Sequence, residues 1–143
     1  HEGSGSWPHT KRFADALLFN ALIGGTDAHA KNYALLIAPS TRVRLAPLYD
    51  LASALPFDTF DRRKLKLAMK LGGTYRLRDV GRDHVSDMAR DLDLDPQKTL
   101  ARARELAERI VAAVAKLVAT MDTAIIGRLC TAIVQNIESL RLG

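Results

Sequence analysis

Apolar residues occupy nine of the 13 positions of the first strongly patterned segment, which runs from Lys11 to Ile23. Because they would cover almost the whole circumference of a helix, the pattern predicts a helix that is buried on all sides. Gly24-Gly25 follows directly, and glycine tolerates the backbone conformations that end helices. Residues 1–10 begin with a Gly/Ser-rich stretch and are expected to be a linker or N-terminal extension, with one domain over residues 11–143.

Two pairs of short segments favour β-strands rather than helices. Tyr33 to Ala38 and Val43 to Leu45 are apolar and β-favouring, and Pro39 to Arg42 between them is typical of a hairpin loop. Further on, leucine and methionine alternate with lysine and alanine over residues 64–71, which is the period of a strand with one buried face. Gly72-Gly73 then fits a two-residue turn, which predicts a second hairpin with one strongly basic face.

The remainder of the chain has helical periodicity. An apolar stripe extends from Val85 to Leu92, and Asp95-Pro96 is a favourable pair of N-cap and first residue for the long helix that follows. That helix is expected to break around residues 121–123, before a last helix that carries apolar residues as far as Leu140. The predicted fold class is therefore mainly α with two short β-hairpins.

Composition narrows the class of protein. The chain has 143 residues, of which 48% are hydrophobic, and this suits one compact domain with a core. It contains no apolar run of about 18 residues, so no membrane partner is expected. A single cysteine among apolar neighbours, Cys130, indicates a core residue and a reducing, cytoplasmic location. The formal net charge of +5 favours polyanionic partners without requiring one.

The stretch GGTDAHAKNYALL, residues 24–36, places many polar side chains between two apolar segments. Asp27 and Asn32 lie five residues apart in it, and a hairpin would return the chain to Asp50 at the same end. Each residue alone is typical of turns or caps, and Asp50 is expected to cap a short helical turn. Together they match metal-dependent phosphoryl transfer, in which one carboxylate takes the hydroxyl proton while an amide and a second carboxylate hold Mg²⁺.

The order of these residues departs from that of ordinary eukaryotic-type kinases. The interval from Asp27 to Asn32 equals that of H-R-D-x-x-x-x-N, but His29 follows the aspartate, as in lipid kinases with D-R-H-x-x-N. The segments LIGGTDAHAKNYALLI, RLAPLYDLASALP and KLKLAM resemble, in order and spacing, the C-terminal lobe of the HipA family of bacterial toxin serine/threonine kinases. The resemblance covers most of the chain and is weaker in the terminal helices.

The resemblance implies a protein-kinase-like C-terminal lobe with ATP and Mg²⁺ as cofactors. It makes Asp27 the catalytic aspartate and Asn32 and Asp50 the magnesium ligands. Lys31 would lie close to phosphate charge, and His29 is also expected to hold the loop by a hydrogen bond. The residues implied to line the nucleotide site are His29, Ala30, Lys31, Asn32, Tyr49 and Asp50.

The same resemblance implies a biological setting. The substrate would be a protein hydroxyl, for example on an aminoacyl-tRNA synthetase, and the outcome would be growth arrest and bacterial persistence. The protein would belong to a type II toxin–antitoxin system. Its partners would be a HipB-like helix-turn-helix antitoxin and, through that antitoxin, operator DNA.

A complete kinase also needs an N-terminal lobe, with a glycine-rich loop over the phosphates and a lysine on a strand. No such loop precedes a strand and lysine in this chain, so residues 11–143 are expected to be a C-terminal lobe that is inactive without the N-terminal lobe of the same parent protein. Two other interpretations stay open. One is a non-catalytic module that docks an antitoxin or DNA, and the other is a lipid or small-molecule kinase with a D-x-H-x-x-N loop.

The basic hairpin also admits two interpretations. Its cations could form a solvated strand face that protects an edge from aggregation, or a surface that contacts phosphates. The solvated face is favoured, because neither interleaved aromatic residues nor a known DNA-reading motif accompanies the cations. The residues concerned are Arg62, Arg63, Lys64, Lys66, Lys70, Arg76 and Arg78.

Overall fold

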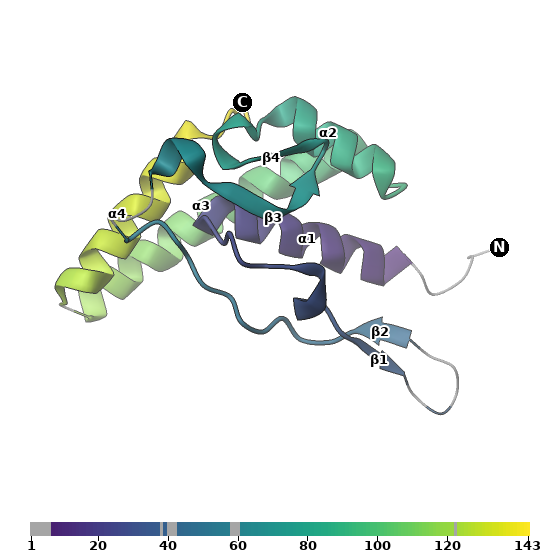
Figure 1. Cartoon of the computed structure of the whole chain (residues 1–143), viewed down its shortest axis with the longest axis horizontal. Helices are drawn as coiled ribbons and strands as arrows, with labels where there is room; N and C mark the ends of the chain where they lie inside the picture. Colours follow the sequence, from purple (N-terminus) through teal and green to yellow (C-terminus); the bar gives the residue numbers. More distant parts are fainter. Residues whose placement is uncertain (1–6, 38, 40–42, 58–60, 122) are drawn as a thin grey trace.

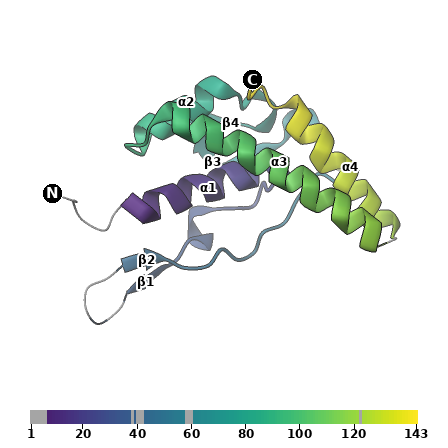
Figure 2. The same ribbon diagram turned by 180° about the vertical axis from the view of Figure 1, so that it is seen from behind.

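A computed structural model describes residues 7–37, 39, 43–57, 61–121 and 123–143. Four helices form the body of the molecule: α1 (Trp7–Ile23), α2 (Arg82–Asp91), α3 (Pro96–Thr120) and α4 (Ala124–Ser139). Helix α1 lies in the middle, with α3 and α4 packed along one side of it and α2 at one end of the body (Figures 1 and 2). None of the helices in the described part of the chain is both long and apolar enough to cross a membrane.

Helix α1 is largely buried, as its pattern predicts. Ala16 is fully buried, and Leu18 and Leu22 are each 2% exposed. The helix begins at Trp7, four residues before the expected start at Lys11 and inside the segment expected to be a linker. A proline in the first helical turn costs little, because its missing N–H would have no partner inside the helix.

The ends of the two long helices follow the sequence signals. Asp95 accepts a hydrogen bond from the backbone N–H of Lys98 at 2.8 Å, so it caps α3 as predicted, with Pro96 in the first position. Helix α3 ends at Thr120, and Thr123 then caps α4 through the N–H of Ile126. Cys130 on α4 is buried, as expected for a core residue.

Both predicted hairpins are present. Strand β1 (Leu35–Ile37) pairs antiparallel with β2 (Val43–Leu45), and most of the loop between them lies outside the described residues. This hairpin projects away from the helical body in both ribbon views (Figures 1 and 2). Its apolar side chains are largely uncovered, with Leu35 60% and Ile37 75% exposed.

The second hairpin packs against the helices instead. Strand β3 (Lys66–Leu71) pairs antiparallel with β4 (Thr74–Arg76), between the short 3-10 helices η2 (Arg62–Lys64) and η3 (Leu77–Asp79). Leu67 and Leu71 are buried while Lys66 and Lys70 are exposed, as the alternation predicts. Ala68 and Met69 between them are both intermediate in burial, and the ladder register shifts between Lys66 and Leu71. The side chain of Arg62 lies outside the described part of the structure.

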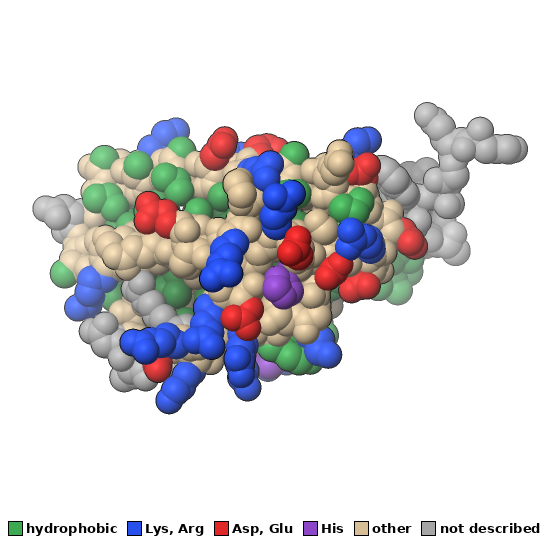
Figure 3. Space-filling model, turned by 90° about the horizontal axis from the view of Figure 1, so that it is seen from above, with side chains coloured by type: hydrophobic (Ala, Val, Ile, Leu, Met, Phe, Trp, Pro, Cys, Tyr) green, Lys and Arg blue, Asp and Glu red, His purple; other side chains and the backbone are tan. Residues whose placement is uncertain are grey.

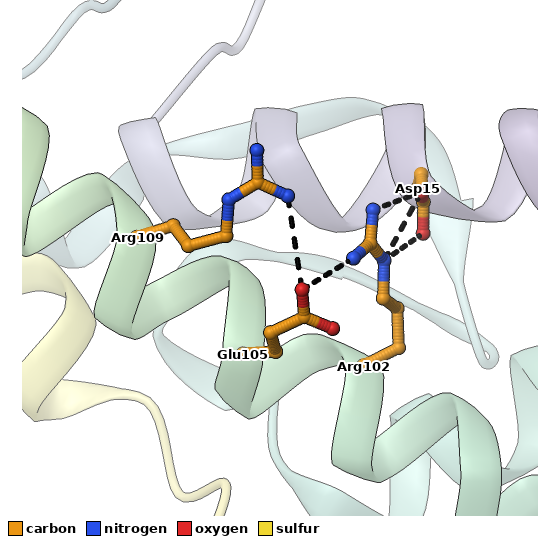
Figure 4. Close-up of polar contacts among 4 residues, drawn as sticks. All are labelled: Asp15, Arg102, Glu105 and Arg109. Atoms are coloured by element: carbon orange, nitrogen blue, oxygen red, sulfur yellow. Dashed lines mark hydrogen bonds and ion pairs between the residues drawn. The ribbon is translucent and has the colours of Figure 1, made fainter.

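A charged cluster joins α1 to α3 (Figure 4). Arg102 donates from Nη2 to Asp15 Oδ2 at 2.8 Å and from Nη1 to Glu105 Oε1 at 2.8 Å, and Arg109 approaches the same Glu105 oxygen. Hydrogen bonding to Asp15, and then to Glu105, raises the pKa of the Arg102 guanidinium above its usual value. Asp15 and Arg102 are 87 positions apart in sequence, so this pair fixes the two helices against each other.

Candidate functional site

The polar stretch of residues 24–36 begins where α1 ends, and two backbone hydrogen bonds set its position. Gly25 donates its N–H to the Asn20 carbonyl at 2.7 Å, and Ala54 donates to the Gly24 carbonyl at 3.1 Å. A Cβ on Gly25 would lie 2.5 Å from Asn20 Oδ1, so only glycine allows the loop to approach the helix this closely. Residues 24–32 are thereby held between the end of α1 and the segment that follows Asp50.

Asn32 and Asp50 lie together, as their order along the chain suggests. A single 3-10 turn, η1 (Ala30–Asn32), carries Asn32 inward until it is 7% exposed. Its Nδ2 donates to Asp50 Oδ2 at 3.0 Å, and its Oδ1 is buried without a hydrogen-bond partner among the described residues. A buried acceptor without a partner destabilises a folded protein, so this oxygen is expected to bind a further group.

Asp50 itself is exposed and has a left-handed backbone, with φ of 56°. The prediction that Asp50 caps a helical turn is wrong, because residues 51–53 are irregular. The segment is held instead by the hydrogen bond from the Ala54 N–H to the Gly24 carbonyl. Asp and Asn adopt this conformation more readily than most residues. Backbone of this kind is found at functional sites, where the surrounding structure holds it in place.

Asp27 and His29 form a second pair. His29 Nε2 lies 3.0 Å from Asp27 Oδ1, and both side chains are well exposed, at 50% and 76%. This contact is an ion-pair distance, and the expectation that His29 holds the loop by a hydrogen bond stays a prediction. The backbone joins the two pairs, because Asn32 donates its N–H to the His29 carbonyl at 2.9 Å. Among the described side-chain contacts, none links Asp27 or His29 to Asn32 or Asp50.

The remaining predicted residues line the same loop. Tyr49 donates its hydroxyl to the backbone carbonyl of Lys31 at 2.9 Å, which links the chain before Asp50 to η1. Ala30 and Lys31 are exposed, and Tyr49 is half exposed. These side chains are therefore accessible to a ligand above the loop.

The chemistry of the Asn32–Asp50 pair fits a magnesium ion. Mg²⁺ prefers oxygen ligands, retains several waters and is commonly held by one or two protein groups together with phosphate oxygens. One buried amide oxygen without a partner beside an exposed carboxylate provides such a set. No cluster of three His, Cys, Asp or Glu side chains that could hold a metal occurs in the described part of the chain, so a site enclosed wholly by such ligands is not formed there.

Two supporting residues, Asn136 and Asn20, were not identified from the sequence. Asn136 on α4 donates from Nδ2 to the carbonyls of Ala21 and Leu22, at 2.9 and 2.8 Å, and so satisfies the last turn of α1. Asn20 donates to Tyr33 Oη at 3.3 Å, next to Asn32. The signal that could have found them is a polar residue on an otherwise apolar helix face, since buried polar groups need partners.

The environment of Tyr33 is partly apolar. Its ring meets Phe13 edge to face, with 5.1 Å between the ring centroids. Burial raises the pKa of the Tyr33 hydroxyl, and the hydrogen bond from Asn20 acts weakly in the opposite direction. Tyr33 thus remains neutral at physiological pH and anchors the residue after Asn32 against α1.

Comparisons with known proteins connect this arrangement to one family. The protein-family model described as the HipA-like C-terminal domain matches residues 4–117 of this chain. The protein Y4dM of Sinorhizobium fredii, which carries a provisional kinase name, is 30% identical over 101 residues, or 68% of this chain and 23% of that protein. The serine/threonine-protein kinase toxin HipA of Shewanella oneidensis is 29% identical over 101 residues, or 71% of this chain and 22% of that protein.

A solved structure has the same fold. HipA of Shewanella oneidensis MR-1, in a complex with HipB and operator DNA, matches with a TM-score of 0.75 and 24% identity, over 87% of this chain and 30% of that chain. This match confirms the predicted kinase-like C-terminal lobe, mainly α with two strand pairs. The chain spans less than a third of the length of each of these relatives.

Proposed function

The chain belongs to the family of HipA-like C-terminal domains, and on that premise we propose that it is the C-terminal catalytic lobe of a serine/threonine protein kinase. In the proposed reaction the γ-phosphate of ATP passes to a protein hydroxyl. Relatives that carry kinase names support this class of reaction. The observation that carries the proposal is the buried Oδ1 of Asn32, which has no partner among the described residues and lies on the side chain that holds Asp50.

Asp27 is the proposed base. Its carboxylate is mostly exposed, so an acceptor hydroxyl can approach it, and His29 already occupies Oδ1. Oδ2, to which no described residue binds, would take the proton of the hydroxyl as its oxygen attacks phosphorus. His29 is a positioning residue in this scheme, because it fixes the orientation of the carboxylate.

Asn32 and Asp50 are the proposed ligands of Mg²⁺, which would neutralise the charge of the nucleotide phosphates when bound. The hydrogen bond between them holds both side chains in one orientation before any ligand arrives. Lys31 and Tyr49 would line the nucleotide site, and the hydrogen bond from the Tyr49 hydroxyl to the Lys31 carbonyl holds the backbone at Lys31 in place. The backbone of Asp50 keeps its carboxylate beside Asn32 rather than in a helical turn.

The N-terminal lobe of the same parent protein is the proposed partner above this site. The apolar side chains of β1 and β2 are exposed and adjoin the loop, and exposed apolar surface of this extent marks an interaction site. Loops over the phosphates and a strand lysine would come from that lobe. The chain alone is therefore proposed to be inactive.

A toxin–antitoxin role is part of the proposal. The solved HipA forms a complex with HipB and operator DNA, and we extend this to a HipB-like antitoxin here, with operator DNA contacted through it. The proposed protein substrate is translation-related, such as an aminoacyl-tRNA synthetase. Its phosphorylation would arrest growth.

The test is transfer of labelled γ-phosphate by the full-length protein in a cytoplasmic lysate, compared between wild type, Asp27→Asn and Asp83→Asn. Asp83 is exposed on α2, so this control removes the same charge away from the loop. We expect one labelled protein band that is lost only with Asp27→Asn. Equal labelling by wild type and Asp27→Asn would refute the role of Asp27.

The same experiment separates the two alternatives. A labelled lipid or small molecule in place of a protein would identify a different class of kinase. No label from any form, together with antitoxin binding that survives mutation of Asp27, Asn32 and Asp50, would identify a non-catalytic docking module.

A further inference from the structure

A basic hollow lies at the open end of the β3–β4 hairpin, on a part of the molecule that the proposed phosphoryl transfer does not use. Its volume is about 580 Å³, and basic side chains gather on this face of the molecule (Figure 3). The hollow is formed where η2 enters β3 and β4 leaves for η3. Its lining residues are Asp61, Arg63, Lys64, Lys66, Arg76 and Arg78.

The strand register places two of these cations directly opposite each other. Lys66 pairs with Arg76 across the antiparallel ladder. Like charges in directly opposed positions destabilise a hairpin, and a solvated strand face could avoid the arrangement by exchanging either residue for a neutral one. The register therefore goes against the interpretation that this face is only a solvated surface.

Few acidic groups balance the cations. Five basic residues against one carboxylate give the hollow a formal charge of +4, close to the +5 of the whole chain. The single carboxylate, Asp61, accepts a hydrogen bond from the backbone N–H of Arg63 at 2.9 Å, so it caps η2. Asp79 on η3 lies 3.5 Å from Arg78 Nε and partly neutralises that cation. No carboxylate among the described residues forms an ion pair with Lys64, Lys66 or Arg76, so the charge of these three residues is available to an external anion.

We propose that the basic hollow binds the phosphate backbone of a duplex nucleic acid without reading its bases. Guanidinium groups, three of the five cations here, match phosphate oxygens with paired N–H donors. Among the residues that the structure describes, none in the lining is an aromatic on which single-stranded bases could stack. The described lining also has no apolar residue that would anchor a peptide. Phosphate contacts alone give affinity and position but no sequence preference.

The test measures binding of the 143-residue chain to a fluorescent, mixed-sequence DNA duplex by anisotropy, across salt concentrations from about 50 to 200 mM. The variant Lys66→Gln/Arg76→Gln removes the opposed pair. The matched control, Arg109→Gln/Lys116→Gln, removes two exposed cations from α3. Thermal unfolding of each variant accompanies the binding curves, and removal of the opposed pair should leave stability unchanged or higher.

We expect Lys66→Gln/Arg76→Gln to bind about tenfold more weakly at low salt and to lower the salt slope by about 2, because each lost phosphate contact removes about 0.9. The control should retain both values. Equal weakening in the two variants, or no duplex binding by the wild type at low salt, would overturn the proposal. So would tighter binding of poly-glutamate than of the duplex, which would assign the hollow to an acidic protein partner. No ATP is present in this assay, so its outcome is independent of the proposed kinase activity.

Discussion

The two glycines in the turn between β3 and β4 differ in the space around them, and this difference gives a sharp test of the packing. Both have positive φ, 51° at Gly72 and 89° at Gly73. A Cβ on Gly72 would overlap the backbone carbonyl oxygen of His84 and lie 2.5 Å from its carbonyl carbon, whereas a Cβ on Gly73 would meet no atom within 4 Å. Gly72→Ala therefore combines backbone strain with a collision against α2, and Gly73→Ala introduces strain alone.

The expected losses of stability follow from these two terms. A left-handed backbone costs an alanine about 1–2 kcal/mol at either position. To relieve the collision, the turn must move about 1 Å from α2, although Leu71 and Val85 next to it are almost fully buried. Loosening a core in this way costs about 1–3 kcal/mol more. We expect Gly72→Ala to lower the free energy of unfolding by about 2–5 kcal/mol and Gly73→Ala by about 1–2 kcal/mol.

Urea denaturation followed by circular dichroism measures both free energies on the same chain. The difference between the variants is the informative quantity, because backbone strain is common to them. Equal losses at Gly72 and Gly73 would refute the packing of this turn against α2. A larger loss at Gly73 would refute the assigned positions of the two residues in the turn.

Three further substitutions test contacts near the site. Asn136→Ala leaves the Leu22 carbonyl without its donor and the Ala21 carbonyl with only the 3.4 Å bond from the Gly24 N–H, and should lower stability by about 1–3 kcal/mol in thermal unfolding. The exposed Glu138→Ala should cost less than about 0.5 kcal/mol, and similar effects of both would refute the role of Asn136. Burial raises the pKa of the Tyr33 hydroxyl above 10.0 in the folded chain. The neutral hydroxyl therefore contributes fully to the free energy of unfolding below pH 10.0, and this contribution is lost as the pH rises through the pKa of the folded state. Stability measured in alkaline titration should therefore fall less steeply in Tyr33→Phe, and parallel curves would contradict this. Arg102→Lys should lower the free energy of unfolding by about 1 kcal/mol or less, because both side chains of its pair with Asp15 are about one-third exposed. A double-mutant cycle with Asp15→Asn measures the coupling, and zero coupling energy would show that the pair does not stabilise the fold.

Periodicity and capping rules predict most of the fold because they describe local physics. The all-round apolar pattern before Gly24 marks a buried helix, and Asp95 caps α3 through Lys98 as its residue type suggests. The start of α1 at Trp7 and the shifted register within β3–β4 lie beyond such rules. Both depend on which surfaces meet in three dimensions.

The candidate site likewise has features that the sequence predicts and features that depend on tertiary contacts. The chain order of Asn32 and Asp50 was enough to expect them at one end of a hairpin, and they lie in hydrogen-bond contact. The backbone of Asp50 could not be anticipated, because it depends on a hydrogen bond between the following segment and Gly24. Asn136 approaches from more than a hundred residues away, and no local pattern connects it to the end of α1.

The left-handed backbone at Asp50 changes how substitutions at this position should be interpreted. An alanine there would remove the carboxylate and also strain the loop by about 1 kcal/mol, so an alanine scan would mix two effects. Asp50→Asn removes the charge while keeping a residue that tolerates this conformation, so it is the cleaner substitution for testing the proposed role of the carboxylate. The same reasoning applies to natural variation. A family member with a β-branched residue here must have a loop of different shape, even where the rest of its motif is intact.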